Sequence, residues 1–210
     1  MSYEFTNDWF DRSARPMWDQ FVLKHNPIKI LEIGSYEGAS TCYLINRLAN
    51  YNKIELHAID TWEGGIENKK GGFVEADMGS VEKRFHKNIE FAKQNAPIKP
   101  AVVVYKEFSD KVLASMLASG KQNYFDFIYV DGSHQAVDVL CDAVLAFRLL
   151  RVGGIMAFDD YNWYEQLPGG IDPIRRPKTA IDAFTMIYCR KVRIIGFDWF
   201  HQLYIEKLED

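Results

Sequence analysis

Short apolar runs alternate along this chain with segments whose apolar residues recur at helical spacing. The apolar runs are rich in β-branched and aromatic residues, which is typical of strands that are covered on both faces. They predict strands at residues 28–33, 54–59, 101–105, 125–130 and 154–158. The intervening periodicity predicts helices at residues 39–50, 80–95, 109–119, 136–151 and 178–189. This alternation predicts an α/β fold with a doubly wound, mostly parallel sheet.

The two ends of the chain depart from this alternation. Apolar residues at helical spacing over residues 14–25 predict a lid or packing helix within the N-terminal segment 1–26. Residues 192–197 and 199–205 predict two strands whose connection is too short for a parallel crossover, so we expect an antiparallel hairpin. With 210 residues, of which 48% are apolar, the chain has the size of one domain spanning residues 1–210.

A glycine turn after the first predicted strand is the first candidate for ligand binding. Residues 32–38 read Glu-Ile-Gly-Ser-Tyr-Glu-Gly, and Gly34 and Gly38 allow a ligand to approach the backbone closely. The dinucleotide pattern G-x-G-x-x-G and the phosphate-loop pattern are absent, and the carboxylate of Glu32 repels phosphate. Asp60, after the second strand, is suited to accept ribose hydroxyls. The pattern therefore favours a neutral or cationic nucleoside such as S-adenosylmethionine, although each acidic residue alone also fits a turn or a cap.

Acidic residues follow the fourth and fifth predicted strands. Asp131 ends the fourth strand with His134 three residues later, and Asp159 and Asp160 end the fifth. Neighbouring parallel strands deliver their carboxyl ends to one edge, so three carboxylates are expected to converge there. A divalent cation with oxygen ligands, such as magnesium, would relieve their repulsion. The plainer alternative is that these aspartates are solvated turn residues or helix caps and that His134 bonds locally.

These motifs resemble those of known enzymes. The pattern Glu-x-Gly-x-x-x-Gly at residues 32–38 resembles the first motif of class I S-adenosylmethionine-dependent methyltransferases. The acidic set is similar to that of metal-dependent O-methyltransferases of the macrolide-sugar (macrocin and mycinamicin) and catechol-type groups. The catechol-type enzymes carry a lysine three residues after the first metal ligand, whereas the macrolide-sugar enzymes carry a histidine, as here at His134. The sugar-modifying branch is thus the closer match.

The resemblance implies a Rossmann-like, seven-stranded sheet and O-methyl transfer to a hydroxyl of a small molecule or sugar. It implies His134 as the catalytic base, with magnesium held by Asp131, Asp159 and Asp160. Glu107 departs from the glycine that relatives often carry, which affects the expected adenine contacts nearby. The residues expected to contact S-adenosylmethionine are Glu32, Gly34, Ser35, Tyr36, Gly38, Ser40, Asp60, Thr61, Trp62, Phe108, Ser109 and Asp131.

The composition of the chain indicates which classes of binding partner and which cellular location to expect. The net charge of −4 and the scattered basic residues favour small substrates over nucleic acid. No apolar stretch approaches a membrane span, so we expect no membrane partner and a cytoplasmic location. Cys42, Cys141 and Cys189 each sit among apolar residues and are expected to be buried thiols in a reducing compartment. The aromatic N-terminal segment leaves a homo-oligomer open.

Three other functions compete with methyl transfer. A catalytically silent module would bind the cofactor and not the metal. A metal-dependent oxygenase of the same branch would need two histidines and a carboxylate, but His134 is the only histidine beside the acidic residues. An NAD-dependent dehydrogenase is disfavoured by the missing third glycine. The identity of the methyl acceptor stays open. The aromatic residues of the two long loops could stack on a sugar or on a phenolic ring equally well, or could simply pack within the protein: Trp62, Phe73, Trp163 and Tyr164.

Overall fold

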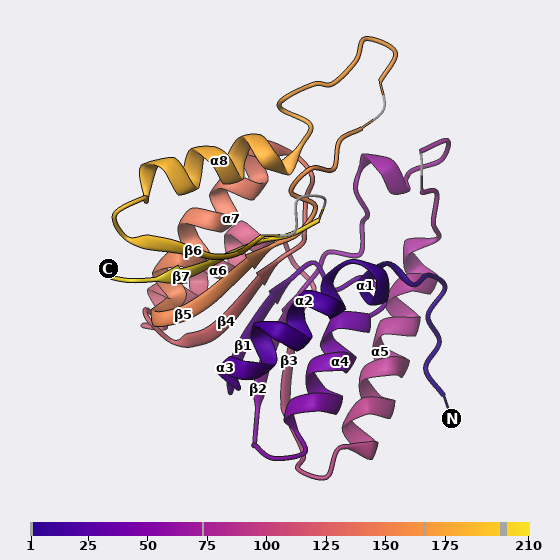
Figure 1. The fold of residues 1–210 in the computed structure, drawn as a ribbon. Helices are drawn as coiled ribbons and strands as arrows, with labels where there is room; N and C mark the ends of the chain where they lie inside the picture. Colours follow the sequence, from indigo (N-terminus) through magenta and orange to yellow (C-terminus); the bar gives the residue numbers. More distant parts are fainter. Residues whose placement is uncertain (1, 73, 166, 198–200) are drawn as a thin grey trace. The chain divides into compact units, whose positions relative to one another are not determined.

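The α/β alternation is present in both halves of the chain (Figure 1). The computed structural model describes residues 2–72, 74–165, 167–197 and 201–210. The chain forms two compact units, Met1–Glu107 and Phe108–Asp210.

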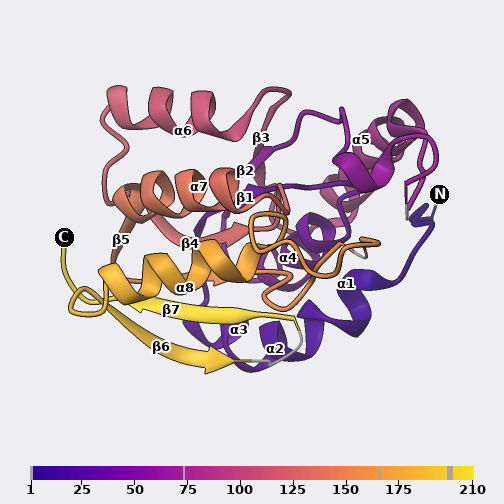
Figure 2. The ribbon, with the colours of Figure 1, turned by 90° about the horizontal axis from the view of Figure 1, so that it is seen from above.

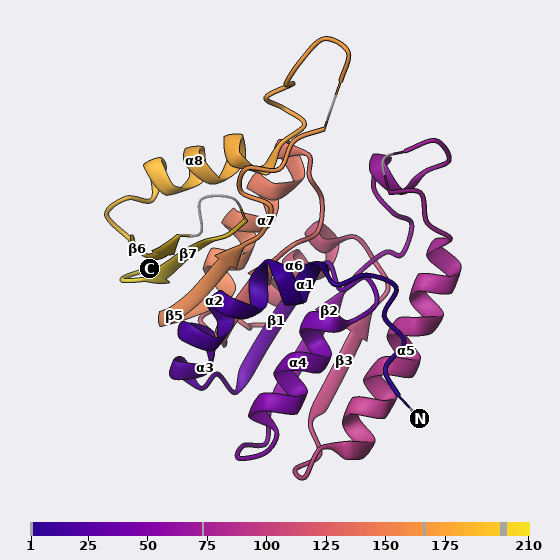
Figure 3. The same cartoon turned by 45° about the vertical axis from the view of Figure 1, so that its right-hand side comes forward.

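The first unit contains three parallel strands in the order β3-β2-β1. Helices α4 and α5 pack against each other alongside these strands (Figure 3). Helix α5 begins where the side chain of Asp77 accepts a hydrogen bond from the Gly79 amide, as an N-cap should. The strands match the predicted ranges to within one residue at either end. The bounds are β1 Lys29–Ile33, α4 Ala39–Leu48, β2 Glu55–Ile59, α5 Met78–Asn95 and β3 Ala101–Tyr105.

The N-terminal segment is less regular than predicted. The single helix expected over residues 14–25 is divided at Phe21, and a short additional helix precedes it. Trp18 is fully buried, with its ring 5.0 Å from that of Phe10 and 6.1 Å from that of Tyr43. Its aromatic surface therefore packs in the core of the first unit. The short helices of this unit are α1 Trp9–Arg12, α2 Ala14–Gln20, α3 Val22–His25 and the 3₁₀ turn η1 Ile66–Asn68.

The second unit contains four strands in the order β4-β5-β7-β6. Strands β4 and β5 are parallel, whereas β7 pairs antiparallel with both β5 and β6. Helix α7 lies between α6 and α8 (Figure 2). The bounds are α6 Ser109–Ala118, β4 Phe125–Val130, α7 Ala136–Leu149, β5 Leu150–Phe158, α8 Pro177–Ile187, β6 Val192–Phe197 and β7 Leu203–Lys207.

The predicted C-terminal hairpin is confirmed, and so is the mostly parallel α/β fold class. The second hairpin strand begins at Leu203 instead of Trp199, and Trp199 lies outside the described residues. The cysteine prediction was correct only for Cys42, which is buried. Cys141 and Cys189 are exposed, because each occupies an outward position at a helix or just after one.

Candidate functional site

The glycine turn of the first unit has the backbone geometry that the sequence predicts. Gly34 and Gly38 have φ values of +84° and +80°, which residues with a side chain rarely adopt. A Cβ on Gly38 would lie 2.9 Å from Cδ2 of Phe85. Both glycines are therefore required by the path of the chain between β1 and α4.

Glu32 is a fully buried carboxylate that organises this turn. Its oxygens accept hydrogen bonds from Ser35 Oγ at 2.7 Å, from Ser40 Oγ at 2.5 Å and from the Thr41 hydroxyl. Burial raises the pKa of Glu32, and the three hydroxyls oppose that rise. The side chain thus ties the turn to the first residues of α4. A direct contact between Glu32 and a cofactor stays a prediction.

Asp60 fixes the other side of the turn. One oxygen accepts the backbone amides of Ser35 and Tyr36, each at 2.9 Å, and the other accepts the Trp62 amide at 2.7 Å. Burial raises the pKa of Asp60, whereas these amides act against the rise. Trp62 is 5% exposed, and its Nε1 donates to the Tyr36 carbonyl at 2.9 Å. Asp60 and Trp62 therefore hold the turn residues that sequence reasoning assigned to the cofactor.

Other predicted cofactor residues have local roles in the structure. The hydroxyl of Thr61 accepts the Glu63 amide at 3.1 Å. In the second unit, Phe108 precedes α6 and is 49% exposed, with Lys111 Nζ 5.1 Å from its ring centre. Ser109 hydrogen-bonds to the buried Asp142. Their contacts with a cofactor stay predictions.

The second unit brings together the three aspartates that the sequence singled out. Oxygens of Asp131, Asp159 and Asp160 all lie within 4.8 Å of one another. They converge because β4 and β5 are parallel neighbours and end side by side. Asp160 has a φ of +52°, a left-handed conformation that turns the chain directly after β5. We call these three residues the acidic cluster.

Two residues that sequence reasoning missed hold the acidic cluster in place. Tyr129 donates its hydroxyl to Asp159 at 2.5 Å, and Gln202 Nε2 donates to the other oxygen of Asp159 at 3.0 Å. The Tyr204 hydroxyl in turn donates to Gln202. The phenol of Tyr129, two residues before Asp131 in a mostly apolar strand, was a detectable signal. Gln202 comes from the distant hairpin and left no local one.

His134 lies at the edge of the acidic cluster. Its Nε2 is 2.7 Å from Asp160 Oδ2, and its ring stacks on Trp163 with centres 4.0 Å apart and planes 25° apart. The carboxylate and the indole together fix the orientation of the imidazole. This geometry matches the arrangement in which a carboxylate orients a histidine and stabilises its protonated form.

The carboxylate oxygens of the acidic cluster are suitable ligands for a divalent cation. Burial raises the pKa of Asp131 well above the usual range, and the charges of Asp159 and Asp160 raise it further. Burial and Asp160 also raise the pKa of Asp159. Three carboxylates held this close disfavour their own ionisation unless a positive charge joins them. Oxygen donors of this kind are the ligands that magnesium prefers.

The aromatic residues of the two long loops differ in accessibility. Trp62 is buried and packs against Phe85, with ring centres 4.9 Å apart, so it serves the core. Trp163 contacts His134, and Tyr164 is 43% exposed. Phe73 lies outside the described residues. Of the loop aromatics considered, Trp163 thus lies beside the acidic cluster, and Tyr164 is open to solvent.

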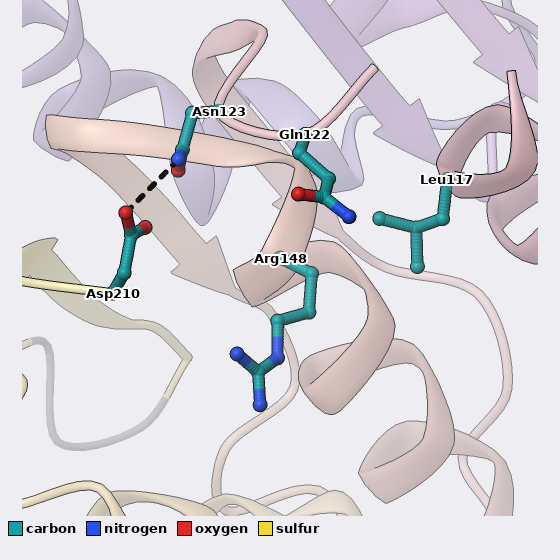
Figure 4. Close-up of a pocket in the computed structure, with 5 residues that line it drawn as sticks. All are labelled: Leu117, Gln122, Asn123, Arg148 and Asp210. Atoms are coloured by element: carbon teal, nitrogen blue, oxygen red, sulfur yellow. Dashed lines mark hydrogen bonds between the residues drawn. The ribbon is translucent and has the colours of Figure 1, made fainter. Parts of the chain in front are cut away.

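A cavity of about 340 Å³ in the second unit lies away from the acidic cluster (Figure 4). Asn123 and Arg148, which line it, flank the starts of β4 and β5, whereas the acidic cluster follows the ends of these strands. Figure 4 shows Asn123 hydrogen-bonded to Asp210, at 3.2 Å, and Arg148 pointing away from that pair. The cavity therefore does not belong to the candidate site.

No helix within residues 2–72, 74–165, 167–197 and 201–210 has the length and apolar character needed to cross a membrane. This finding agrees with the absence of a long apolar stretch in the sequence.

The sequence of the chain is similar to that of a known methyltransferase. The chain is 27% identical over 174 residues to a caffeoyl-CoA O-methyltransferase from Populus kitakamiensis, covering 80% of this chain and 64% of that protein. The chain thus spans somewhat less than two thirds of that relative.

Two solved structures share the fold. The O-methyltransferase from Bacillus cereus in complex with SAH has a TM-score of 0.64 at 18% identity, covering 99% of this chain and 84% of that one. TomG, an O-methyltransferase from Streptomyces achromogenes involved in tomaymycin synthesis and solved with SAM, has a TM-score of 0.64 at 15% identity, covering 93% and 80%. The predicted Rossmann-like fold with its C-terminal antiparallel strands is confirmed.

The family assignment rests on more than half of the chain. A profile of the methyltransferase domain matches residues 31–161, from the strand before the glycine turn to the residue after the acidic cluster. The matched region contains the glycine turn, Asp60, the acidic cluster and His134. The chain therefore belongs to a methyltransferase domain family, as its motifs predicted.

Proposed function

We propose that this protein is an S-adenosylmethionine-dependent O-methyltransferase that requires a divalent cation, magnesium, and acts on a hydroxyl of a small molecule or sugar. Family membership and O-methyltransferase neighbours solved with SAM or SAH support methyl transfer. The observation that carries the metal requirement is the acidic cluster, whose three carboxylates lie within 4.8 Å beside an oriented histidine.

The glycine turn supports the cofactor part of the proposal. Its backbone is shaped by two left-handed glycines and fixed by Glu32 and Asp60, so the turn is preorganised before a ligand arrives. Preorganisation lowers the entropy that binding has to offset. The turn also lacks a cationic side chain, which suits a cofactor that carries a sulfonium and no phosphate.

The reaction is a displacement at the sulfonium methyl group. The acceptor oxygen forms a bond to the methyl carbon, the carbon–sulfur bond breaks, and S-adenosylhomocysteine leaves with the electron pair. A magnesium ion held by Asp131, Asp159 and Asp160 would lower the pKa of the acceptor hydroxyl and fix its position.

His134 receives the hydroxyl proton in this proposal. The imidazole, held by the 2.7 Å contact of its Nε2 with Asp160, is the group that accepts this proton. Asp160 stabilises the imidazolium that results, and stacking on Trp163 keeps the ring in its plane. The cluster of three carboxylates with His134 beside Asp160 supports an oxygen-ligand metal site more than the two-histidine, one-carboxylate site that an oxygenase would need.

The acceptor is a small molecule or sugar in this proposal, and nucleic acid and membranes are not partners. The net charge of −4 supports this choice. Trp163 and Tyr164 are candidates for stacking on the acceptor, because one contacts His134 and the other is exposed. A cytoplasmic location is a part of the proposal that rests on the sequence alone, and the oligomeric state stays open.

The test is formation of S-adenosylhomocysteine from S-adenosylmethionine with a panel of catechols and sugars, measured with magnesium and with EDTA. We expect turnover with magnesium, its loss with EDTA, and its loss in Asp160→Asn. Asp126→Asn is the matched control, because Asp126 lies at the other end of β4, where it pairs with Arg151 at 2.6 Å. Equal turnover with EDTA would remove the metal from the proposal. Failure to bind S-adenosylmethionine would overturn the proposal as a whole.

A further inference from the structure

Residues 3–9, which we call the N-terminal strap, run along α5 in the first unit (Figure 3). The Glu4 amide donates to Asn88 Oδ1 at 2.7 Å, and Asn88 Nδ2 donates back to the Glu4 carbonyl at 3.1 Å. The Tyr3 ring meets the Phe91 ring edge-on with centres 4.9 Å apart. The strap is therefore docked by backbone hydrogen bonds as well as by aromatic packing.

The strap continues onto Glu37, a turn residue that sequence reasoning left without a role. Glu37 is 2% exposed and accepts the Thr6 amide at 2.7 Å and the Thr6 hydroxyl at 2.8 Å. Arg84 of α5 donates Nε to the same carboxylate at 2.5 Å. A buried carboxylate needs a charge partner and hydrogen bonds, and here the strap supplies two of those hydrogen bonds.

Asn88 joins the strap to the backbone of the turn. It is fully buried, and the Nδ2 that contacts Glu4 also donates to the Glu37 carbonyl at 2.9 Å. The amide side chain of Asn88 therefore hydrogen-bonds to both the strap and the turn and holds the two together. Displacement of either partner leaves a buried polar group unsatisfied.

The turn is thus held from two sides. Asp60 fixes the amides of Ser35 and Tyr36, and the strap fixes Glu37, the next residue. The Trp9 ring, at the end of the strap, lies 5.4 Å from the Tyr36 ring. Tyr36 has a φ of +49°, an uncommon conformation for a residue with a side chain, so its conformation depends on these contacts.

We propose that Glu37 is a positioning residue through which docking of the N-terminal strap and binding of the cofactor favour each other. The inference rests on the proposed function, in which the glycine turn contacts S-adenosylmethionine. When the strap is docked, Glu37 and Asn88 hold the turn in its binding conformation. By thermodynamic linkage, a ligand that prefers this conformation also stabilises the docked strap.

The first test compares Thr6→Val with Thr6→Ser by titration with S-adenosylhomocysteine. Valine keeps the shape of threonine and removes the hydroxyl bonded to Glu37, whereas serine keeps the hydroxyl. We expect Thr6→Val to raise the dissociation constant about fivefold or more, and Thr6→Ser to match the parent. Glu4→Gln is the control within the strap, because its carboxylate, as far as the described residues show, pairs with Lys87 at the surface, where an ion pair contributes little to stability. It should leave the dissociation constant unchanged.

The second test is hydrogen exchange of residues 2–9 in the parent, with and without S-adenosylhomocysteine. Coupling predicts slower exchange in this segment when the ligand is bound. In turnover assays, Thr6→Val should raise KM for S-adenosylmethionine with kcat unchanged at saturation, an effect that mere loss of stability would not produce.

The possible outcomes separate the two proposals. If the parent binds the ligand but Thr6→Val binds it equally well, or if exchange of residues 2–9 is unaffected, the coupling is overturned and the proposed function stands. If the parent binds no S-adenosylhomocysteine, the proposed function fails and the coupling fails with it.

Discussion

Replacing Asp131 by asparagine tests whether the acidic cluster is held under electrostatic strain for a metal. The substitution keeps the size of the side chain and removes one of three carboxylates whose oxygens lie within 4.8 Å. A structural aspartate should lose stability on this change. A metal ligand in a repulsive cluster should gain stability without metal and lose the metal.

The magnitude follows from the geometry. Two unit charges 4.8 Å apart repel by about 3 kcal/mol at an effective dielectric constant of about 20. We count only the pair that Asp131 forms with Asp159, the larger of the two charge effects on Asp131, so the figure is a lower bound. The Tyr129 hydroxyl, which donates to Asp159, also hydrogen-bonds to Asp131, and this second interaction weakens when the charge is removed, which costs about 1 kcal/mol. The net expectation in metal-free buffer is a gain of about 2 kcal/mol, or about 4–8 °C in Tm for a chain of this size.

The assay is thermal unfolding with EDTA and with magnesium. Magnesium at about ten times its dissociation constant should stabilise the parent by about 1.4 kcal/mol and leave Asp131→Asn unchanged. Asp126→Asn, on the same strand, should keep the magnesium response of the parent. The reasoning is refuted if Asp131→Asn lowers Tm in EDTA while its response to magnesium persists.

Three further predictions concern other parts of the chain. His134→Ala should lower turnover about 100-fold or more while the dissociation constant for S-adenosylhomocysteine stays the same, as measured by titration; an unchanged rate would exclude the histidine as base. Gly38→Ala should destabilise the protein by about 2 kcal/mol and weaken cofactor binding, because a Cβ there combines a φ of +80° with a 2.9 Å approach to Phe85; unaltered binding and Tm would contradict this. Burial raises the pKa of Asp142 to about 7, so the native state keeps a proton that the unfolded chain releases above about pH 4. The free energy of unfolding should therefore fall by up to about 4 kcal/mol between pH 4 and pH 7 because of Asp142. In Asp142→Asn, the free energy of unfolding measured by chemical denaturation should depend less on pH over this range.

Residues close in sequence account for the parts of the fold that were predicted well. The strands at 101–105, 125–130 and 192–197 have the predicted bounds, because each is a short run with strong β propensity between clear breaks. The acidic cluster was predictable for a related reason. Asp131 and Asp159 directly follow neighbouring parallel strands, and topology then brings them together.

Features that depend on tertiary contacts were not predictable. Gln202, which lies 43 residues away just before β7, donates to Asp159, and Thr6, 31 residues away, donates to Glu37. The helical periodicity over 14–25 gave no sign of the break at Phe21. Apolar neighbours in the sequence suggested that Cys141 is buried, but helix α7 turns this side chain outward. In each case the deciding partner lies far away in the chain or on another face of the helix.

The interpretation of Glu32 shows how structure refines a motif. The sequence places its carboxylate where a cofactor is expected, whereas the structure gives both oxygens hydroxyl partners from the chain itself. The structure thus gives Glu32 a role in shaping the turn, and its direct contact with the cofactor stays a prediction.

The most direct test of the central claim is titration of the protein with magnesium in the presence of saturating S-adenosylhomocysteine. The account predicts one magnesium ion bound per chain in the parent and none in the double variant Asp131→Asn, Asp160→Asn, with S-adenosylhomocysteine bound by both proteins. Magnesium binding that survives in the double variant, or no magnesium binding by the parent, would contradict the assignment of the acidic cluster as the metal centre.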